Sequence, residues 1–543
     1  HHDGMHYFPI EGRSDAGVLV LNHEYIEPRF MHQAAQGQNF GSGSFPMIDE
    51  STRDTDQVLR EMNAHGVSVY RVQRDASGVW APVQGDSFNR RITALTAMEI
   101  SGPVRGSDFV KTQFSPAGTE TRGTLNNCAH GVTPWNTYMM SEENWAGYFL
   151  NTAEQPDSQS RYGVRSSGSS RYAWELAQSG EEQYTRFNAT PSGASATDDF
   201  RNEPHCFGWM VEFDPFDSAS KPVKRTALGR FAHEGVVFAP AIEGQPVVCY
   251  SGDDARFEYI YKFVSAQPYH AATAGGHLLD SGTLYVAKFN DDGTGEWIPL
   301  CSDTESFVPG MSVADVLIFT RLAADKVAPT KMDRPEDVEP NLVNGKVYAA
   351  LTNNSQRGSR FEPDEANPLT TSMVRSSIGA PLTEASGNRN GYVLEMTADG
   401  NDHTRTTFTW DLMLVCGDPE APETYFAGYD KAEVSPISCP DNVAFDSAGN
   451  LWVSTDGNVL GSNDGIFRVP VTGSERGHVQ QFVTMPRGAE ACGPLITDRN
   501  RSLFFAVQHP GEIDGATFED QASTWPHTDD FPRPSVVVAF RRR

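Results

Sequence analysis

The segment at residues 123 to 145, GTLNNCAHGVTPWNTYMMSEENW, brings together residue types that bind two kinds of metal ion. Its single cysteine, Cys128, lies in a Gly/Asn turn before a short aromatic strand, and Glu142 and Glu143 follow that strand. A lone thiolate among carboxylates suits a transition metal such as iron, whereas carboxylate and amide oxygens suit calcium. Cys128 and Glu143 therefore indicate two ligand types for one mixed metal site.

The composition argues against several classes of function. The 543 residues include 71 acidic and 43 basic side chains, and the formal charge of -28 repels nucleic acid and anionic membranes but favours cation binding. No apolar run reaches the length of a bilayer span. We expect a monomer that binds neither nucleic acid nor a membrane. The chain opens at His1 without a methionine or a signal-like stretch, so we expect any export segment to have been removed or to lie outside these residues.

The cysteines indicate neither of the two common frameworks. Seven cysteines are scattered without a CxxC pair, which argues against a zinc ribbon and against a dense disulfide scaffold. Because the number is odd, at least one thiol is outside any intrachain bridge and is available for a metal or a reaction.

Short β-rich runs bounded by Gly, Asn or Asp dominate the chain and predict an all-β fold. Helical periodicity is confined to residues 54 to 66 and 311 to 327, which we expect to be short insertions. When the chain is compared with itself, six copies of one unit appear, in each of which a polar residue precedes a short strand that leads into a hairpin. The copies begin at HHDGMHYFP (residue 1), NCAHGVTPW (127), AHEGVVFAP (232), PEDVEP (335), PDNVAF (440) and GAEACGPLI (488).

This repeat predicts a single domain over residues 1 to 543, a six-bladed β-propeller with short helical insertions and an axial metal-cluster site. In a propeller the innermost strand of every blade runs along the central channel, so residues at the strand entries converge on one pocket. Converging carboxylates repel one another by several kcal/mol in a partly dry pocket unless cations neutralise them. We therefore expect several metal ions. The candidate ligands are Asp3, Cys128, Glu234, Glu336, Asp441 and Glu490 at the strand entries, with Glu24, Glu143 and Asp253 on the second strands.

Each candidate also has an ordinary structural interpretation. Cys128 could be a buried thiol, but its place in the repeat favours a ligand. Asp441 is as compatible with a strand cap as with ligation, and Asp456 and Asn353 are better explained as hairpin-turn residues. Histidines that flank candidate ligands in sequence are expected to orient ligands rather than to bind metal: His23, His130 and His233.

Arg334 is the side chain that we expect to bind an anion. It precedes Glu336 by two residues, so in a β conformation both side chains point to the same face of the strand. An unpaired arginine beside metal-bound carboxylates matches phosphate oxygens with its planar fork. We therefore assign Arg334 a substrate-binding and catalytic role.

In these motifs the sequence resembles the PhoX-type alkaline phosphatases over nearly its whole length. The resemblance rests on HDGMHYFP, LNHEY, NCAHGVTPWNTYMMSEEN, HEGVVF, YSGDDARFEYIYKFVS, RPEDVE and QHPG taken together. It implies a six-bladed propeller that is exported after folding through the twin-arginine route and is periplasmic or secreted. It also implies two ferric ions, three calcium ions and a bridging oxo group, with iron on Cys128, Glu234 and Glu336 and calcium on the remaining oxygens. The implied activity is hydrolysis of phosphomonoesters for phosphate acquisition.

The mechanism we expect is metal-assisted phosphoryl transfer, in which a metal-bound oxide or hydroxide is the nucleophile and inorganic phosphate is released. Calcium and Arg334 would hold the phosphate and offset the charge on its equatorial oxygens. One alternative is a calcium-dependent lactonase or esterase of the six-bladed propeller type, which would leave Cys128 and most carboxylates without a purpose. A non-catalytic cation-binding propeller is a third alternative, and Arg334 in the axial pocket argues against it.

Overall fold

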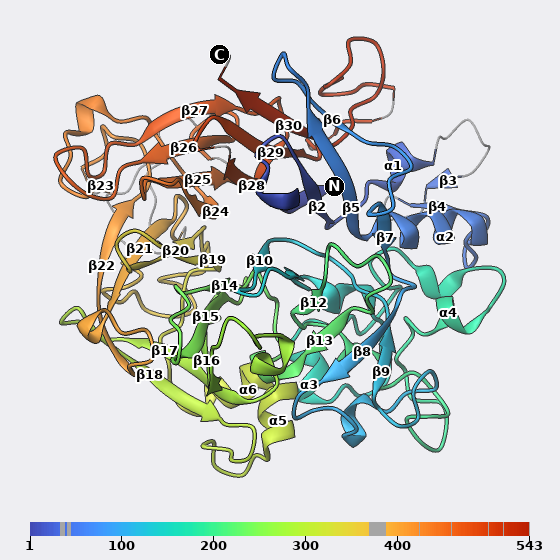
Figure 1. The fold of residues 1–543 in the computed structure, drawn as a ribbon. Helices are drawn as coiled ribbons and strands as arrows, with labels where there is room; N and C mark the ends of the chain where they lie inside the picture. The colour runs from blue at the N-terminus through green and yellow to red at the C-terminus, as the bar shows by residue number, and fades with distance from the viewer. Residues whose placement is uncertain are drawn as a thin grey trace.

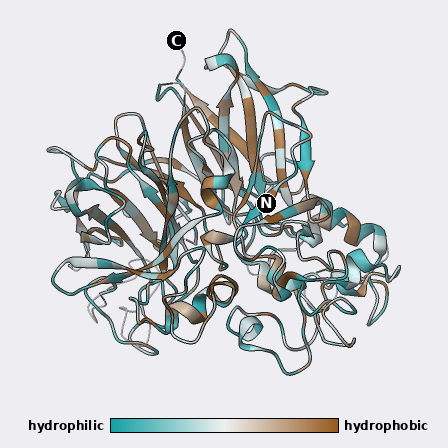
Figure 2. Cartoon of the chain, turned by 60° about the horizontal axis from the view of Figure 1, so that its bottom comes forward, coloured by the Kyte–Doolittle hydropathy of each residue, from teal (hydrophilic) through white to brown (hydrophobic). Residues whose placement is uncertain are grey.

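The computed structural model describes residues 1–32, 39–40, 45–368, 387–422, 424–457, 459–497, 499–513, 515–517 and 519–541. These residues form a mostly β structure, as predicted, in which the sheets are arranged in a ring around a common centre (Figure 1). Hydrophobic residues concentrate in the strands, and hydrophilic residues concentrate in the connecting loops (Figure 2). The first strand, β1 (His2–Pro9), contacts β28 (Glu490–Thr497), so segments from the two ends of the chain lie side by side.

Six inner strands begin in or just after the six repeated segments, as predicted. Each pairs with the next strand along the chain in an antiparallel hairpin, and neighbouring members of the six contact one another in a closed circuit from β1 back to β1. The entries of six separate segments therefore converge. The inner strands are β1, β10 (His130–Val132), β14 (Val237–Phe238), β19 (Pro335–Pro340), β24 (Pro440–Phe445) and β28.

The other strands extend these hairpins outward, and the third and fourth hairpins share one ten-stranded sheet. The first sheet contains β1, β2 (Ala16–His23), β5 (Gly66–Arg74), β6 (Trp80–Pro82) and β7 (Arg90–Ile92). The second has the order β10, β11 (Tyr138–Met140), β12 (Val211–Phe213), β13 (Val223–Arg225), β8 (Ala97–Ser101) and β9 (Glu120–Arg122). The ten-stranded sheet runs β14, β15 (Pro246–Gly252), β16 (Ile260–Pro268), β17 (Gly282–Phe289), β18 (Thr294–Cys301), β22 (Thr407–Val415), β21 (Tyr392–Ala398), β20 (Val347–Leu351) and β19, with β23 (Tyr425–Phe426) on β22.

The last part of the chain forms two smaller sheets that complete the ring. One contains β24, β25 (Leu451–Thr455), β26 (Gly465–Val469) and β27 (Gln480–Thr484), and the other contains β28, β29 (Ser502–Gln508) and β30 (Ser535–Phe540). A separate two-stranded pair joins β3 (Asn39–Phe40) to β4 (Pro46–Met47).

Helices are short insertions between the strands. The helix expected within residues 54 to 66 forms as α2 (Thr55–Ala64), and the Asp54 carboxylate caps it by accepting a hydrogen bond from the Gln57 backbone N–H at 3.0 Å. The stretch 311 to 327 forms two helices, α5 (Val313–Ile318) and α6 (Thr320–Asp325), because Phe319 between them departs from helical backbone angles. The remaining α-helices are α1 (Pro28–Met31), α3 (Asp157–Ser160) and α4 (Glu182–Thr185). In the described part of the chain, every helix is too short or too polar to cross a membrane.

Apolar residues pack neighbouring sheets face to face. The first and second sheets share a cluster in which Phe8, Val20 and Val69 meet Tyr138 and Phe213, and none of these side chains is more than 2% exposed. Burial on both faces explains why the strand sequences lack a clean polar face. This packing gives the inner strands a rigid support, and their polar entry residues are held at the centre of the ring.

Candidate metal centre and active site

The entries of the inner strands line a cavity of about 480 Å³. Nine metal ligands and one arginine are predicted here from the sequence, and the cavity wall contains seven of those ligands together with Arg334. The other two are Asp3, which is fully buried beside the wall, and Asp253. The seven ligands in the wall are Glu24, Cys128, Glu143, Glu234, Glu336, Asp441 and Glu490.

Irregular pairing near the start of the inner strands determines where these side chains point. β1, β19, β24 and β28 each contain a shift of register against the neighbouring strand. Such an irregularity bends a strand and re-aims its side chains. Asp3, Glu336 and Asp441 lie within three of these shifts. Arg334 and Cys439, which immediately precede two of the strands, have positive φ angles of 55° and 54°, a strained conformation that is typical of functional sites.

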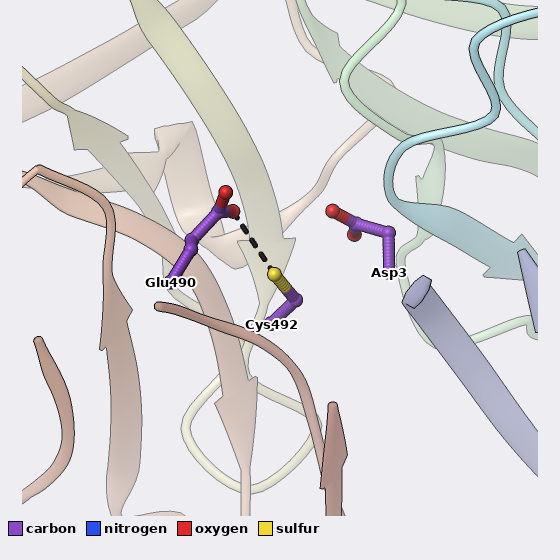
Figure 3. A group of neighbouring side chains, drawn as sticks. All are labelled: Asp3, Glu490 and Cys492. Carbon is purple, nitrogen blue, oxygen red and sulfur yellow. Dashed lines mark hydrogen bonds between the residues drawn. The ribbon is translucent and has the colours of Figure 1, made fainter. Parts of the chain in front are cut away.

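Potential ligand atoms form five groups of three among the described residues, and within each group the atoms lie within 4.8 Å of one another. Four residues belong to two groups each, so the groups join into one continuous cluster. Figure 3 shows the group formed by Asp3, Glu490 and Cys492. The other groups are Asp3 with Glu24 and Cys128; Cys128 with Glu143 and Glu234; Glu234 with Glu336 and Asp441; and Asp456 with Glu490 and His509.

Two oxygen atoms of this cluster are buried without a hydrogen-bond partner: Asp3 Oδ1 and Glu234 Oε2. A buried polar atom without a partner costs about 1–3 kcal/mol, and more if it is charged. The other oxygen of Glu234 accepts hydrogen bonds from Cys128 Sγ at 3.4 Å and Asn442 Nδ2 at 3.1 Å. Carboxylates with free oxygens beside thiols are a donor set that fits a mixture of hard and thiophilic cations.

Burial and mutual repulsion raise the pKa values of the carboxyl groups in the cluster. Burial and the nearby Asp3 raise the pKa of Glu24 to about 8, and burial raises the pKa of Asp3 to about 6. Cations would therefore be needed to bring every carboxyl group to its charged form at neutral pH. For the same two reasons, pKa values lie well above the ordinary range for Glu143, Glu234, Glu336, Asp441 and Glu490.

Arg334 lines this cavity. The sequence predicts an unpaired arginine, whereas in the structure Arg334 is paired with two carboxylates. Its Nε and Nη2 donate to Asp254 Oδ1 and Oδ2 at 2.8 and 2.7 Å, and Nη2 lies 3.0 Å from Glu336 Oε1. Although burial lowers it, the pKa of Arg334 is held well above its ordinary value by Asp254 and Glu336. The two carboxylates fix the plane of the guanidinium group at the cavity wall.

Asp253 is the predicted ligand that the structure places outside the cavity wall. Its carboxylate forms a buried ion pair with Arg321, in which Nε donates to Oδ2 at 2.8 Å. The next residue, Asp254, lines the cavity instead and pairs with Arg334. Successive side chains of an extended segment point to opposite sides. A prediction that is displaced by one residue therefore selects Asp253, whose carboxylate forms a structural ion pair, instead of Asp254, whose carboxylate lines the cavity.

Three further residues of the cluster were not among the predicted ligands. Asp456, which the sequence favours as a turn residue, lines the cavity and is grouped with Glu490 and His509. His509 Nε2 lies 3.0 Å from Glu490 Oε2. Cys492 follows Glu490 by two residues on the same strand, and this i, i+2 spacing is the signal that could have identified its thiol.

The histidines expected to orient ligands bond to other groups in the structure. His23 Nε2 lies 2.6 Å from Ser68 Oγ, and His233 lies 2.9 Å from Ser251 Oγ through Nδ1 and 3.0 Å from the Gly229 carbonyl through Nε2. The third, His130, stacks on the Tyr138 ring with a centroid separation of 5.4 Å. These rings therefore support the strands around the cavity rather than the ligands themselves.

Comparison with known proteins relates this geometry to a family. The family model for alkaline phosphatase PhoX matches residues 1–511. Among solved structures, Pseudomonas fluorescens PhoX in complex with vanadate, a transition state analogue, is 34% identical, with a TM-score of 0.80, over 100% of this chain and 88% of that chain. A protein of unknown function from Dyadobacter fermentans is 10% identical over 100% of this chain and 95% of that chain, but its TM-score of 0.33 is too low to indicate a shared fold. A search of curated proteins found no match. The family match and the similarity to the solved phosphatase agree with the residues gathered in the cavity. The chain therefore belongs to the PhoX family of alkaline phosphatases and is a metal-dependent enzyme that hydrolyses phosphate esters.

Proposed function

We propose that this phosphatase works with two ferric ions, three calcium ions and a bridging oxo group, all held in the central cavity. One observation supports the proposal: five groups of carboxylate, thiol and imidazole donors join into one cluster of eleven residues, nine of which line the same cavity as Arg334. So many acidic groups in a buried space need cations for neutralisation. Cys128, Glu234 and Glu336 would ligate iron, and calcium would fall to the remaining oxygens of Asp3, Glu24, Glu143, Asp441 and Glu490.

We also propose that the architecture is a six-bladed β-propeller formed by one domain over residues 1–543. The closed circuit of six inner strands supports this proposal. The ten-stranded sheet would then be two blades joined where β18 pairs with β22. The contact between β1 and β28 supports a single domain, because it joins the first sheet to the last.

Arg334 would hold the phosphate group of the substrate. Asp254 and Glu336 occupy its Nε and Nη2 atoms, and no described residue accepts a hydrogen bond from its Nη1 atom. A guanidinium group fixed in this way is preorganised to donate to an anion. When bound, the cations would neutralise the carboxylates, offset charge on the phosphate and lower the pKa of water that attacks phosphorus. Because only the phosphate would be recognised, phosphomonoesters of different alcohols would be accepted and inorganic phosphate released.

The biological setting is part of the same proposal. Membership of the family supports a periplasmic or secreted enzyme of phosphate acquisition. The monomeric state remains a prediction. The expectation that the chain binds neither nucleic acid nor a membrane also remains a prediction, which rests on its composition and charge. The family match and the similarity to the solved phosphatase favour a phosphatase over the two alternatives that the sequence alone left open, a calcium-dependent lactonase or esterase and a non-catalytic propeller.

Elemental analysis combined with two assays tests the proposal. We expect the purified chain to contain about two iron and three calcium ions, and to hydrolyse a generic phosphomonoester but not a simple lactone. Cys128→Ser should lose iron and reduce phosphatase activity to background while the chain stays folded, since a serine oxygen is a poor substitute for a thiolate. Cys249→Ser is the matched control, because Cys249 is buried in an apolar cluster with Met139 and Phe238. Full iron content and activity in Cys128→Ser would remove Cys128 from the site.

A further inference from the structure

A second thiol belongs to the candidate metal cluster, and the iron and calcium ligands proposed above do not include it. Cys492 is fully buried and follows Glu490 by two residues on β28. Its Sγ atom lies 2.9 Å from Glu490 Oε1, and the Asp3 carboxylate on β1 points toward both side chains (Figure 3). One donor atom from each of the three residues lies within 4.8 Å of the other two. The thiol therefore shares one small space with two carboxylates.

Polar atoms around this group lack the partners that burial requires. Asp3 Oδ1 and Gln508 Oε1 have no hydrogen-bond partner, and both side chains are 0% exposed. Gln508 Nε2 lies within hydrogen-bond distance of three acceptors, namely Asp3 Oδ2 at 2.9 Å, Glu24 Oε2 at 3.1 Å and Cys492 Sγ at 3.2 Å. An amide nitrogen carries only two hydrogens. The space around Asp3 therefore has more acceptors than donors, which is the condition that a bound cation relieves.

We propose that Asp3, Glu490 and Cys492 bind a thiophilic divalent transition-metal ion of the zinc class, at a site additional to the one at Cys128. This ion is bound in addition to the two iron and three calcium ions proposed above, and it shares the Asp3 and Glu490 carboxylates with calcium. This inference rests on the proposed role of the cavity as a metal centre. Calcium takes oxygen ligands, whereas one thiolate with two carboxylates suits zinc and similar ions. On binding, the Cys492 thiol gives up its proton to solvent and the thiolate forms the bond to the metal. Gln508 Nε2 lies beside Asp3 and Cys492, and rotation of this amide by half a turn brings the neutral oxygen Oε1 to the same place, where it can complete the coordination.

The observed geometry is close to that of such a site. Metal–sulfur and metal–oxygen bonds of about 2.3 and 2.0 Å place tetrahedral ligands about 3.5 Å apart. The observed separations, 2.9 Å between Cys492 and Glu490 and at most 4.8 Å across the group, lie on both sides of that value. Small rotations of the side chains are sufficient to enclose an ion. Asp3 also belongs to the group with Glu24 and Cys128, so its two oxygens can join the new ion to the rest of the cluster.

Cadmium is a suitable probe, because it is thiophilic and its bonds to thiolates absorb in the ultraviolet. The full-length chain is exchanged into cadmium, and the thiolate-to-cadmium absorbance and the bound cadmium are measured per chain. We expect Cys128→Ser and Cys492→Ser each to lose about half of the absorbance, because each removes one of two thiolate ligands. The double variant should lose nearly all of it, and Cys249→Ser should lose none. If Cys492→Ser keeps the full absorbance and the full cadmium content, Cys492 is an ordinary buried thiol and the proposal is wrong.

Two further measurements keep the result interpretable. Cadmium NMR of the wild-type chain needs no variant: it should show two signals shifted by a sulfur ligand, and a single such signal would overturn the proposal. Phosphatase activity of the wild-type chain with its native metals is measured in parallel. Activity with only one sulfur-shifted signal would refute the additional site and leave the proposed function intact. Two sulfur-shifted signals without activity would refute the proposed function and leave the site intact.

Discussion

Two adjacent glutamates at the end of β11 show how differently buried carboxylates are neutralised inside and outside the central cavity. Glu142 Oε1 accepts a hydrogen bond from Lys224 Nζ at 2.7 Å, and its Oε2 accepts from the backbone N–H groups of Gly208 and Trp209 at 3.0 and 3.1 Å. Glu143 lies in the cavity wall, where Glu24, Asp254 and Glu336 raise its pKa further after burial has raised it. The first glutamate is satisfied by the protein, whereas the second is surrounded by like charges.

Other buried acids outside the cavity follow the pattern of Glu142. Glu61 pairs with Arg53 at 2.6 Å, Glu203 pairs with Arg186 at 3.2 Å, and Asp253 pairs with Arg321. A buried charge is tolerated when a partner of opposite charge accompanies it. The described residues that line the cavity include more acidic than basic side chains, so bound cations would be needed to neutralise the excess negative charge. The predictions that follow test this contrast, beginning with the largest expected effect.

Removal of the cations should have the largest effect. We expect a strong chelator to abolish phosphatase activity of the full chain, and we expect iron and calcium together to restore it. The reason is that the cavity without cations holds carboxyl groups that remain protonated and no source of activated water. Activity of the chelated chain above background would contradict a metal-dependent mechanism. The measurement is hydrolysis of a chromogenic phosphomonoester before chelation, after chelation and after reconstitution.

The stability of the chelated chain should fall as the pH rises. Folding raises the pKa of Glu24 from 4.5 to about 8, so the folded chain binds this proton more tightly than the unfolded chain. Its contribution to stability is present below pH 4.5 and is lost as the pH rises through about 8. The loss is on the order of 5 kcal/mol for Glu24 alone. Denaturant unfolding of the chelated chain near pH 4 and pH 9, on either side of the two pKa values, measures it. Greater stability at the higher pH would contradict the assignment, whereas bound cations should remove the loss.

Substitution of the two adjacent glutamates tests the contrast directly. In chelator, Glu142→Gln should destabilise the chain by about 3–5 kcal/mol, because Lys224 stays buried without its charged partner. Glu143→Gln should leave the stability of the chelated chain unchanged or increase it, because it removes one of several like charges. With metals present, the larger loss of activity is expected for the other variant: Glu143→Gln should lose bound metal and activity, and Glu142→Gln should lose less of both. Equal losses of stability in chelator would show that both glutamates are ordinary structural residues.

Arg334→Ala should reduce kcat/KM by at least about 100-fold, which corresponds to about 3 kcal/mol for a charge-assisted contact with phosphate. Inhibition by inorganic phosphate should weaken in parallel. Metal content should stay the same, because arginine does not ligate cations, and Arg334→Lys should recover only part of the activity because it restores the charge without the fork. Loss of metals with unchanged phosphate affinity would instead make Arg334 a structural partner of Asp254 and Glu336.

Much of this molecule was predictable from its sequence, because the signals are local or repeated. The six repeated segments locate the inner strands, and seven of nine predicted ligands line the cavity. The error at Asp253 is one of register: a Gly-Asp-Asp turn does not reveal which carboxylate meets Arg321 and which faces the cavity. The pairing of Arg334 with Asp254 joins residues that are 80 positions apart, and nothing local encodes it.

Asp456 and Cys492 were not predicted as ligands from the sequence, for a different reason. Asp456 has the composition of an ordinary hairpin turn, and only convergence with Glu490 and His509 distinguishes it. Cys492 carries a local signal, since it follows Glu490 by two residues, but a single cysteine is more often a buried apolar residue. The site was therefore harder to predict than the fold, because the site depends on contacts between residues that lie far apart in the sequence.

The smallest effect is expected at His509, whose Nε2 lies 3.0 Å from Glu490 Oε2 at the edge of the cavity. We expect His509→Ala to lower metal affinity and kcat/KM by about tenfold, because a partner that orients a ligand typically contributes that much or more. His478 is a matched control: its Nδ1 lies 2.9 Å from Glu475 Oε2, but the Glu475 side chain is 58% exposed. His478→Ala should change neither quantity, since exposed pairs contribute little. Competition with a chelator measures the metal affinity of both variants. If the two substitutions behave alike, His509 does not orient Glu490 as a ligand, and the pair at Glu490 contributes no more to metal binding than an exposed pair does.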